Sequence, residues 1–251
     1  MSWLPNFLRN PIVLLLGENC THTIVDELNI FDPVCFKYAV SKALGLGIVL
    51  GGCIVKLPQI MKILRSRSAR GLSLSAFFLE TIANIVTVAF NMREGYSFTT
   101  YGESLFIGIQ NYFITITILL FSNMEWIGMV SAGLIMALGY LLYDPSMTSA
   151  STLSMLQALT IPIVISSRIP QIMKIHKEKS TGQLSAFSVF NYFIGTAARV
   201  YTTFVEVDNN IVLLGFVLSL VTNGILAGQM IYYWNSQEPK KQAKKQAKKT
   251  N

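Results

Sequence analysis

Two pairs of polar residues stand 112 positions apart in this 251-residue chain. Lys56 and Arg168 are cations within apolar stretches, where a positive charge is costly unless it meets an anion. Together they would hold a phosphate, and arginine can bond a phosphate with two N–H groups at once. Asn111 and Asn223 carry amides, which offer donors and an acceptor to sugar hydroxyls. Each pair also has a structural interpretation, namely snorkelling of the cations to the interface and hydrogen bonding of the amides between packed helices.

The two cations open two copies of one motif. Residues 56–73 match residues 168–185 without a gap, with nine of eighteen positions identical and three more exchanging Lys for Arg. A match of this length around a Pro-Gln dipeptide predicts an internal duplication.

The dipeptides Pro58-Gln59 and Pro170-Gln171 are candidate hinges. A proline within a helix removes one hydrogen bond and clashes with the preceding turn, so it produces a kink. Gln59 and Gln171 are placed to bond the freed carbonyls. Two equivalent kinks would let the repeats rock between open states, and a static kink at a helix end is the alternative.

Three further charges fall inside apolar stretches. Glu80 and Arg199 differ by about 10 Å in predicted height, which argues against a direct pair. Glu103 has a depth closer to that of Arg199 and is the better partner. Burial favours the neutral form of Glu80.

The composition indicates an integral membrane protein. The chain is 52% hydrophobic and 13% charged, whereas a soluble domain has about 25% charged residues. Backbone groups in lipid must bond internally, so apolar stretches of about 20 residues are expected to be helices. The expected spans are residues 39–60, 72–92, 101–121, 125–143, 152–173, 184–205 and 211–234.

Seven spans and a 112-residue repeat predict an all-α, 3+1+3 architecture with parallel repeats. The expected domains are a lumenal segment (1–37), a first three-helix repeat (38–121), a linker helix (122–150), a second repeat (151–234) and a Lys-rich tail (235–251). Basic residues gather in the loops after the two Pro-Gln motifs and in the tail, so the positive-inside rule places these in the cytosol and the N-terminus in the lumen. This clustering of the +7 net charge is a topology signal and argues against nucleic-acid binding.

Processing signals lie near both ends of the chain. Cys20 and Cys35 share a hydrophilic segment. They could form a disulfide there or remain two free thiols, and the sequence leaves both alternatives. Asn19 begins a glycosylation sequon. Lys248 and Lys249 resemble the dilysine retrieval address of endoplasmic reticulum proteins, with a generic basic tail as the alternative. No cluster of Cys and His suggests a metal site, and no cofactor is expected.

The Pro-Gln motifs resemble the PQ-loop repeat family, which includes the SWEET sugar transporters, cystinosin and the KDEL receptor. Within that family the chain most resembles the mannose-P-dolichol utilization defect branch, through residues 41–49, 55–59, 71–74, 101–106, 182–185 and 233–235. The resemblance implies an endoplasmic reticulum membrane protein needed for the use of dolichol-phosphate-mannose and -glucose in N-glycan, O-mannose, C-mannose and GPI-anchor assembly. It also implies that Asn111 and Asn223 contact sugar, as paired asparagines do in SWEET transporters.

Three functions follow as hypotheses. The first is binding, movement or presentation of a dolichol-linked sugar phosphate, with the lipid bilayer and that lipid as partners. The second is a non-transporting adaptor that organises glycosyltransferases through its basic loops and tail. The third is a small-solute or sugar transporter of the SWEET type. An enzyme is not expected, because no nucleophile and base stand together in the sequence.

Overall fold

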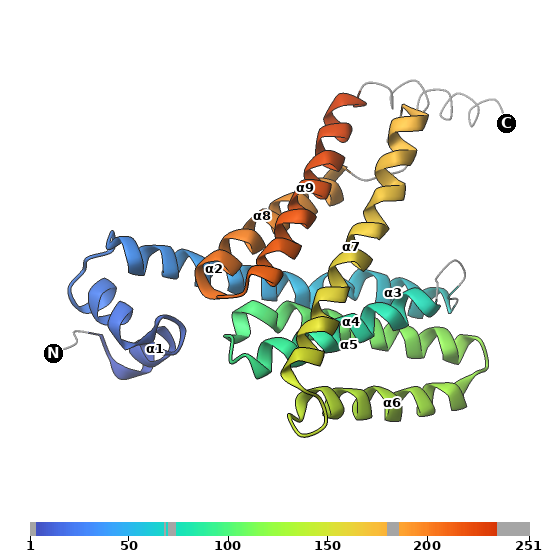
Figure 1. The fold of residues 1–251 in the computed structure, drawn as a ribbon, viewed down its shortest axis with the longest axis horizontal. Coiled ribbons are helices and arrows are strands. Elements are labelled where there is room, and N and C mark those ends of the chain that lie inside the picture. Colours follow the sequence, from blue (N-terminus) through green and yellow to red (C-terminus); the bar gives the residue numbers. More distant parts are fainter. Residues whose placement is uncertain (1–3, 68, 70–73, 180–185, 235–251) are drawn as a thin grey trace. The chain divides into compact units, whose positions relative to one another are not determined.

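The computed structural model describes residues 4–67, 69, 74–179 and 186–234. Described residues form helices joined by short turns, so the predicted all-helical fold is confirmed (Figure 1). The helices are α1 (Asn6–Thr21), α2 (Pro33–Ile54), α3 (Leu57–Ser66), α4 (Leu74–Arg93), α5 (Phe98–Phe121), α6 (Glu125–Tyr143), α7 (Ala150–Glu178), α8 (Ala186–Glu206) and α9 (Asn210–Tyr232), with a short π-helical segment, η1 (His22–Asp26), after α1.

Local sequence explains where several helices begin and end. Asp32 precedes Pro33, and its carboxylate accepts hydrogen bonds from the backbone N–H groups of Val34 and Cys35, which caps α2. Asn209 caps α9 in the same way. Gly95 has a φ of 73°, a left-handed conformation that suits the tight turn between α4 and α5.

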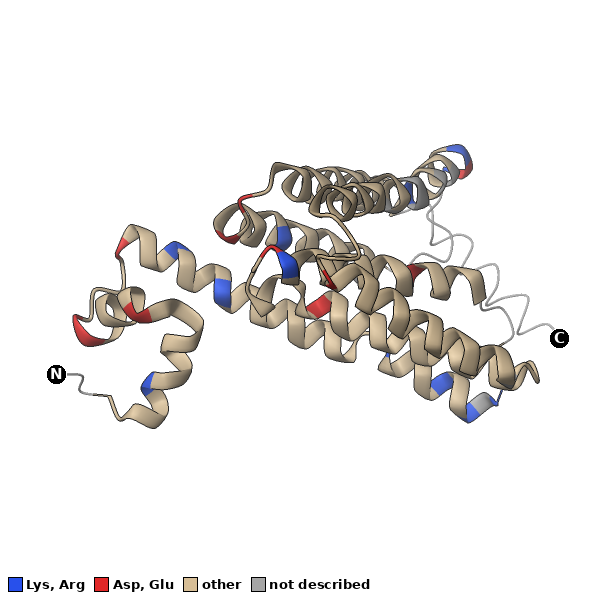
Figure 2. Cartoon of the chain, turned by 60° about the horizontal axis from the view of Figure 1, so that its bottom comes forward, with Lys and Arg blue, Asp and Glu red and all other residues tan. Residues whose placement is uncertain are grey.

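Five segments of the described chain are long and apolar enough to cross a membrane: Pro33–Arg65, Leu74–Arg93, Phe98–Phe121, Trp126–Tyr143 and Asn210–Tyr232. Large apolar side chains such as Met129 and Met136 of α6 are about 70% exposed, as expected for a surface in contact with lipid. Figure 2 shows long stretches of helix that carry no charged residue. The arrangement of seven spans stays a prediction, because neither α7 nor α8 is among these five segments of the described chain.

The described chain divides into two compact units. The first comprises residues 4–157 and 202–208, and the second residues 158–201 and 209–234, each with the gaps given above. In the first unit α5 packs against α2 and α4, and α6 lies alongside α4 and α5 (Figure 1). This packing positions the polar residues of α5 against the end of α2.

The duplication is visible in the cores of the two units. Ile63, Ile114 and Ile118 are buried together in the first unit, packed against Ile60, Leu74 and Phe77. The second unit buries a cluster at the equivalent positions, 112 residues later: Ile175, Leu226 and Met230 with Ile172, Ala186 and Val189. Each repeat therefore uses the same helix faces to build its own core, although most of the side chains differ.

Candidate functional site

The first Pro-Gln motif lies at a break between two helices. α2 ends at Ile54, and α3 begins at Leu57, with Pro58 in its first turn, where the missing N–H costs little. Gln110 of α5 bridges the break: its amide oxygen accepts the Lys56 backbone N–H at 3.0 Å, and its amide nitrogen donates to the Gly52 carbonyl at 2.6 Å. From the sequence, Gln59 was expected to bond the backbone groups freed by Pro58, and the role of Gln110 was not predicted.

The second Pro-Gln motif is built differently. α7 continues through positions 168–175 with no break, so Pro170 and Gln171 lie within one helix. The position equivalent to Gln110 is Thr222, whose hydroxyl donates to carbonyls of its own helix, Leu218 and Ser219. The two motifs are therefore not equivalent: Gln110 bridges an interrupted helix at the first, whereas at the second Gln229 of α9 donates to the Ile172 carbonyl of a continuous helix, at 3.2 Å. The hinge role of both motifs stays a prediction.

The two symmetric cations also have different neighbours. The ammonium group of Lys56 lies 3.4 Å from the carboxylate of Glu80 in α4. Arg168 instead stacks on the ring of Tyr192, with 4.8 Å between its guanidinium carbon and the ring centroid. Tyr192 occupies the position equivalent to Glu80, so one repeat neutralises its cation and the other does not. Among the described residues no carboxylate pairs with Arg168.

Both candidate sugar-binding asparagines are buried within their own units. Asn111 of α5 has no exposed surface, and Asn223 of α9 is 5% exposed. Neither the nitrogen nor the oxygen of the Asn111 amide has a hydrogen-bond partner among the described residues. A buried amide without partners costs about 1–3 kcal/mol for each unmet group. The sugar-binding role of Asn111 and Asn223 stays a prediction.

A buried ion pair connects distant parts of the first unit. Lys42 of α2 and Glu206 at the end of α8 lie 2.7 Å apart, with side chains 6% and 5% exposed. Ser41 and Ser97 donate further hydrogen bonds to Glu206, at 2.6 and 2.8 Å. Burial raises the pKa of Glu206, but the hydrogen bonds from Lys42, Ser41 and Ser97 outweigh it and leave the pKa below its usual value.

Sequence analysis missed this ion pair, although a signal was present. The expected spans 39–60 and 184–205 and the expected topology put Lys42 and Glu206 at span ends on one side of the membrane, as charges of opposite sign. The sequence does not reveal the rotation of each helix, which decides whether two side chains at one height face each other.

The remaining intramembrane charges occupy separate units. Arg199 lies in the second-unit part of α8, with 6% of its surface exposed. Glu103 lies in α5 of the first unit and packs closely against Gly52 of α2. A Cβ built on Gly52 would lie only 3.0 Å from the Glu103 Cα. The pairing of Arg199 with Glu103 stays a prediction. Glu80 was expected to be buried, whereas its side chain is 46% exposed and lies beside Lys56.

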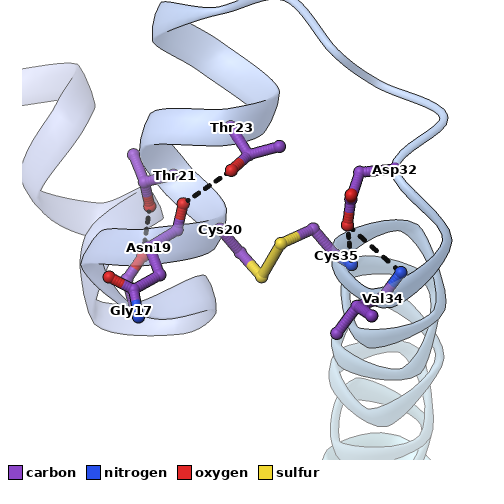
Figure 3. The surroundings of a disulfide bond; sticks show 8 residues. All are labelled: Gly17, Asn19, Cys20, Thr21, Thr23, Asp32, Val34 and Cys35. Atoms are coloured by element: carbon purple, nitrogen blue, oxygen red, sulfur yellow. Dashed lines mark hydrogen bonds between the residues drawn. A yellow bond between two sulfur atoms is a disulfide. The ribbon is translucent and has the colours of Figure 1, made fainter.

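Cys20 and Cys35 are joined by a disulfide that ties α1 to the start of α2 (Figure 3). Asn19 is exposed at the end of α1, but the sequon's Thr21 is fully buried and donates its hydroxyl to the Gly17 carbonyl. A glycan on Asn19 would therefore have to be added before this helix forms. Lys248 and Lys249 lie outside the described residues. Within the described residues, no group of His, Cys, Asp and Glu could hold a metal ion.

Two of the comparisons with known proteins bear on this chain. The family model described as "PQ loop repeat" matches residues 40–100 and 152–212, which contain the two Pro-Gln motifs. Human solute carrier family 66 member 3 is 29% identical over 181 residues, which cover 69% of this chain and 85% of that protein. No solved structure matches the chain significantly.

Proposed function

Because two segments of this chain match the PQ loop repeat and five of its helices could cross a membrane, we propose that it is a membrane protein of that family that binds a dolichol-linked sugar phosphate and moves or presents it. The setting would be the endoplasmic reticulum membrane, with a lumenal N-terminus and a cytosolic C-terminus. The likeness to a solute carrier supports a transport-like activity over chemistry. The seven-span, 3+1+3 arrangement is part of this proposal.

The observation that carries the proposal is the buried Asn111 amide without partners. A purely structural asparagine between packed helices would be expected to hydrogen-bond across them, since an unmet amide is costly in a low-dielectric interior. A sugar hydroxyl supplies both a donor and an acceptor, which the amide can bond at once.

Arg168 supplies the charge that a lipid phosphate requires. Lys56 is largely neutralised by Glu80, whereas Arg168 keeps its charge and stacks on Tyr192. The guanidinium lies over the ring, and a cation–π contact uses none of its N–H groups, which can donate to a phosphate. Arg168 is therefore the principal phosphate ligand in this proposal, and Lys56 has a lesser role.

The test uses purified full-length protein and a labelled dolichol-phosphate-mannose analogue in liposomes. Asn111→Leu removes the amide at nearly constant volume, so we expect melting temperature to stay equal or rise while binding and movement are lost. Asn91→Leu is the matched control, because Asn91 is also buried with an unmet amide oxygen but is no part of the site. Full binding by the Asn111 variant would refute the sugar-binding role.

Two alternatives predict other results. An adaptor for glycosyltransferases would capture those enzymes while the wild-type protein neither bound nor moved the lipid. A transporter of small sugars would move free mannose or glucose and ignore the lipid-linked form.

A further inference from the structure

Helices α4, α5 and α6 enclose an apolar groove within the first unit that the proposed function does not use. Its volume is about 440 Å³. Small residues leave room for it, namely Ala89, Gly108 and Gly139, one from each helix. A Cβ on Gly139 would meet no atom within 4 Å, so the space beside that residue is open.

The position of this α4–α6 groove determines what can fill it. Its three helices are all among the segments able to cross a membrane, so the groove faces hydrocarbon. Along α4 it runs from Thr81 to Met92, about 16 Å at 1.5 Å per residue, which is close to half of a hydrocarbon core about 30 Å thick. The groove therefore matches the depth of one leaflet.

The size of the groove favours a lipid chain over another helix. A helix with its side chains is about 10–12 Å across, too wide for a space whose volume is typical of small-molecule sites. A single acyl chain is narrow enough and has the apolar surface that this lining requires.

A cation stands at the mouth of the groove. Arg93 follows the lining residue Met92, and its Nη1 donates to the carbonyls of Leu142 and Thr148, at 3.2 and 2.7 Å. These bonds hold the guanidinium beside the end of α6, where the lining ends at Tyr143. Asp144 follows and lies near enough to interact electrostatically with Arg93. A fixed cation with an anion nearby matches a headgroup that carries a phosphate and an ammonium group.

We infer that the α4–α6 groove binds a zwitterionic phospholipid of the leaflet at the Arg93 end, with one acyl chain between the three helices and its phosphate at Arg93. Neither Asn111 nor Arg168 lines this groove, and the inference does not depend on the proposed function.

The experiment places the full-length protein in nanodiscs with a phosphatidylcholine that carries a photoreactive diazirine in mid-chain. Labelled peptides are mapped by mass spectrometry, and label is expected on residues that line the groove, such as Ile85 and Ile135. Gly139→Leu should fill the groove. Each displaced methylene weakens binding about fourfold, so the loss of two should reduce label roughly fifteenfold.

Gly133→Leu is the matched control. Gly133 lies on the same helix, also has open space beside it, and does not line the groove. Both variants exchange a helical glycine for leucine, so any general effect on α6 is shared, and label in the Gly133 variant should stay at the wild-type level.

A headgroup comparison tests Arg93 without altering the protein. Diacylglycerol with the same diazirine lacks the phosphate and should label the groove several-fold less than phosphatidylcholine. Arg93→Gln should remove that difference. If this variant does not fold, the lipid comparison on the wild-type protein decides the question. Equal labelling by both lipids would overturn the role of Arg93.

Three results would overturn the groove assignment. They are even labelling along all lipid-facing helices, equal labelling of the Gly139 and Gly133 variants, and cross-links between two copies of the chain at the groove in place of lipid label. The last would show that a second copy covers this face.

Discussion

Lys56 and Arg168 occupy equivalent positions in the two repeats but have different partners. Glu80 lies beside Lys56, and a tyrosine occupies the matching position beside Arg168. An ammonium group beside a carboxylate contributes little net charge, whereas a guanidinium on an aromatic ring keeps its charge and its hydrogen-bond donors. At the scale of single residues, the duplication has therefore produced one structural cation and one that can bind an anion.

Arg168→Gln should weaken binding of dolichol-phosphate-mannose more than Lys56→Gln does. A hydrogen bond to a charged group contributes about 1.5–3 kcal/mol, so we expect the dissociation constant of the Arg168 variant to rise roughly tenfold to a hundredfold. The Lys56 variant should change it by less than about threefold. Equilibrium binding of a fluorescent analogue to purified protein measures both, and equal losses would contradict the assignment.

Lys42 and Glu206 form the most buried ion pair among the described residues. Removal of one partner leaves the other charge buried, at a cost of about 3–5 kcal/mol, so Glu206→Gln should lower stability strongly. The double variant Lys42→Met, Glu206→Leu should be more stable than Glu206→Gln alone. Thermal melting in detergent compares both variants with the wild type, and a double variant that is less stable than Glu206→Gln would contradict the interaction.

The same pair gives a dependence on pH. The folded pKa of Glu206 is lowered, so its stabilisation is complete above the usual glutamate pKa of about 4.3 and is lost as the pH falls through the lower folded value. We expect a flat melting temperature from pH 5.5 to 8 and a fall below pH 4.5. The melting temperature of the Glu206→Gln variant should fall less below pH 4.5 than that of the wild type, because the variant has no carboxylate to protonate at this position.

At the scale of elements, the interrupted helix α2–α3 depends on a single side chain of α5. Gln110 bonds both the Lys56 N–H and the Gly52 carbonyl, the two backbone groups that a continuous helix would have bonded to each other. The break is therefore maintained by tertiary contact as well as by Pro58. In the second repeat Thr222 cannot reach across, and α7 is continuous.

Gln110→Leu should destabilise the first unit, because two buried backbone groups lose their partners at about 1–3 kcal/mol each. Thr222→Val is the control at the equivalent position, where the hydroxyl bonds only its own helix, and it should change stability by less than about 1 kcal/mol. Thermal unfolding of both variants tests this. A similar effect of the two substitutions would mean that Gln110 does not support the break.

At the scale of the whole molecule, each of the two units is a helical body with its own core. A disulfide ties the N-terminal helix α1 to α2. The disulfide between Cys20 and Cys35 closes a loop of about the length for which chain entropy gives roughly 3 kcal/mol. It joins α1 to the first turn of α2, and an oxidising lumen on that side of the membrane would permit it.

Reducing agent should therefore lower the melting temperature of the wild-type protein, and Cys20→Ser with Cys35→Ser should reproduce the effect. Cys53, the free cysteine of α2, serves as the control: Cys53→Ser should melt like the wild type and respond to reductant as it does. Two reactive thiols at positions 20 and 35 in protein purified without reductant would contradict a lumenal location for this segment.

Some of the site was predictable because it depends on pattern alone. The repeat showed which positions are equivalent, and so Lys56, Arg168, Asn111 and Asn223 were identified as pairs. The break at residues 55–56, the bridge by Gln110 and the ion pair of Glu206 were not identified. Each depends on which way a side chain of one helix faces another helix, and hydropathy carries little information on that rotation.

The sequence by itself determined the helical class, most of the membrane segments and the duplication, since apolar run length and internal bonding leave lipid-exposed backbone little choice but helix. Only the tertiary structure decided which charges neutralise each other. Helices of similar composition can rotate about their axes at small cost to the hydropathy pattern. The packing of α2, α4 and α5 selects one rotation, and that selection places Glu80 beside Lys56 and leaves the amide of Asn111 buried without a partner among the described residues.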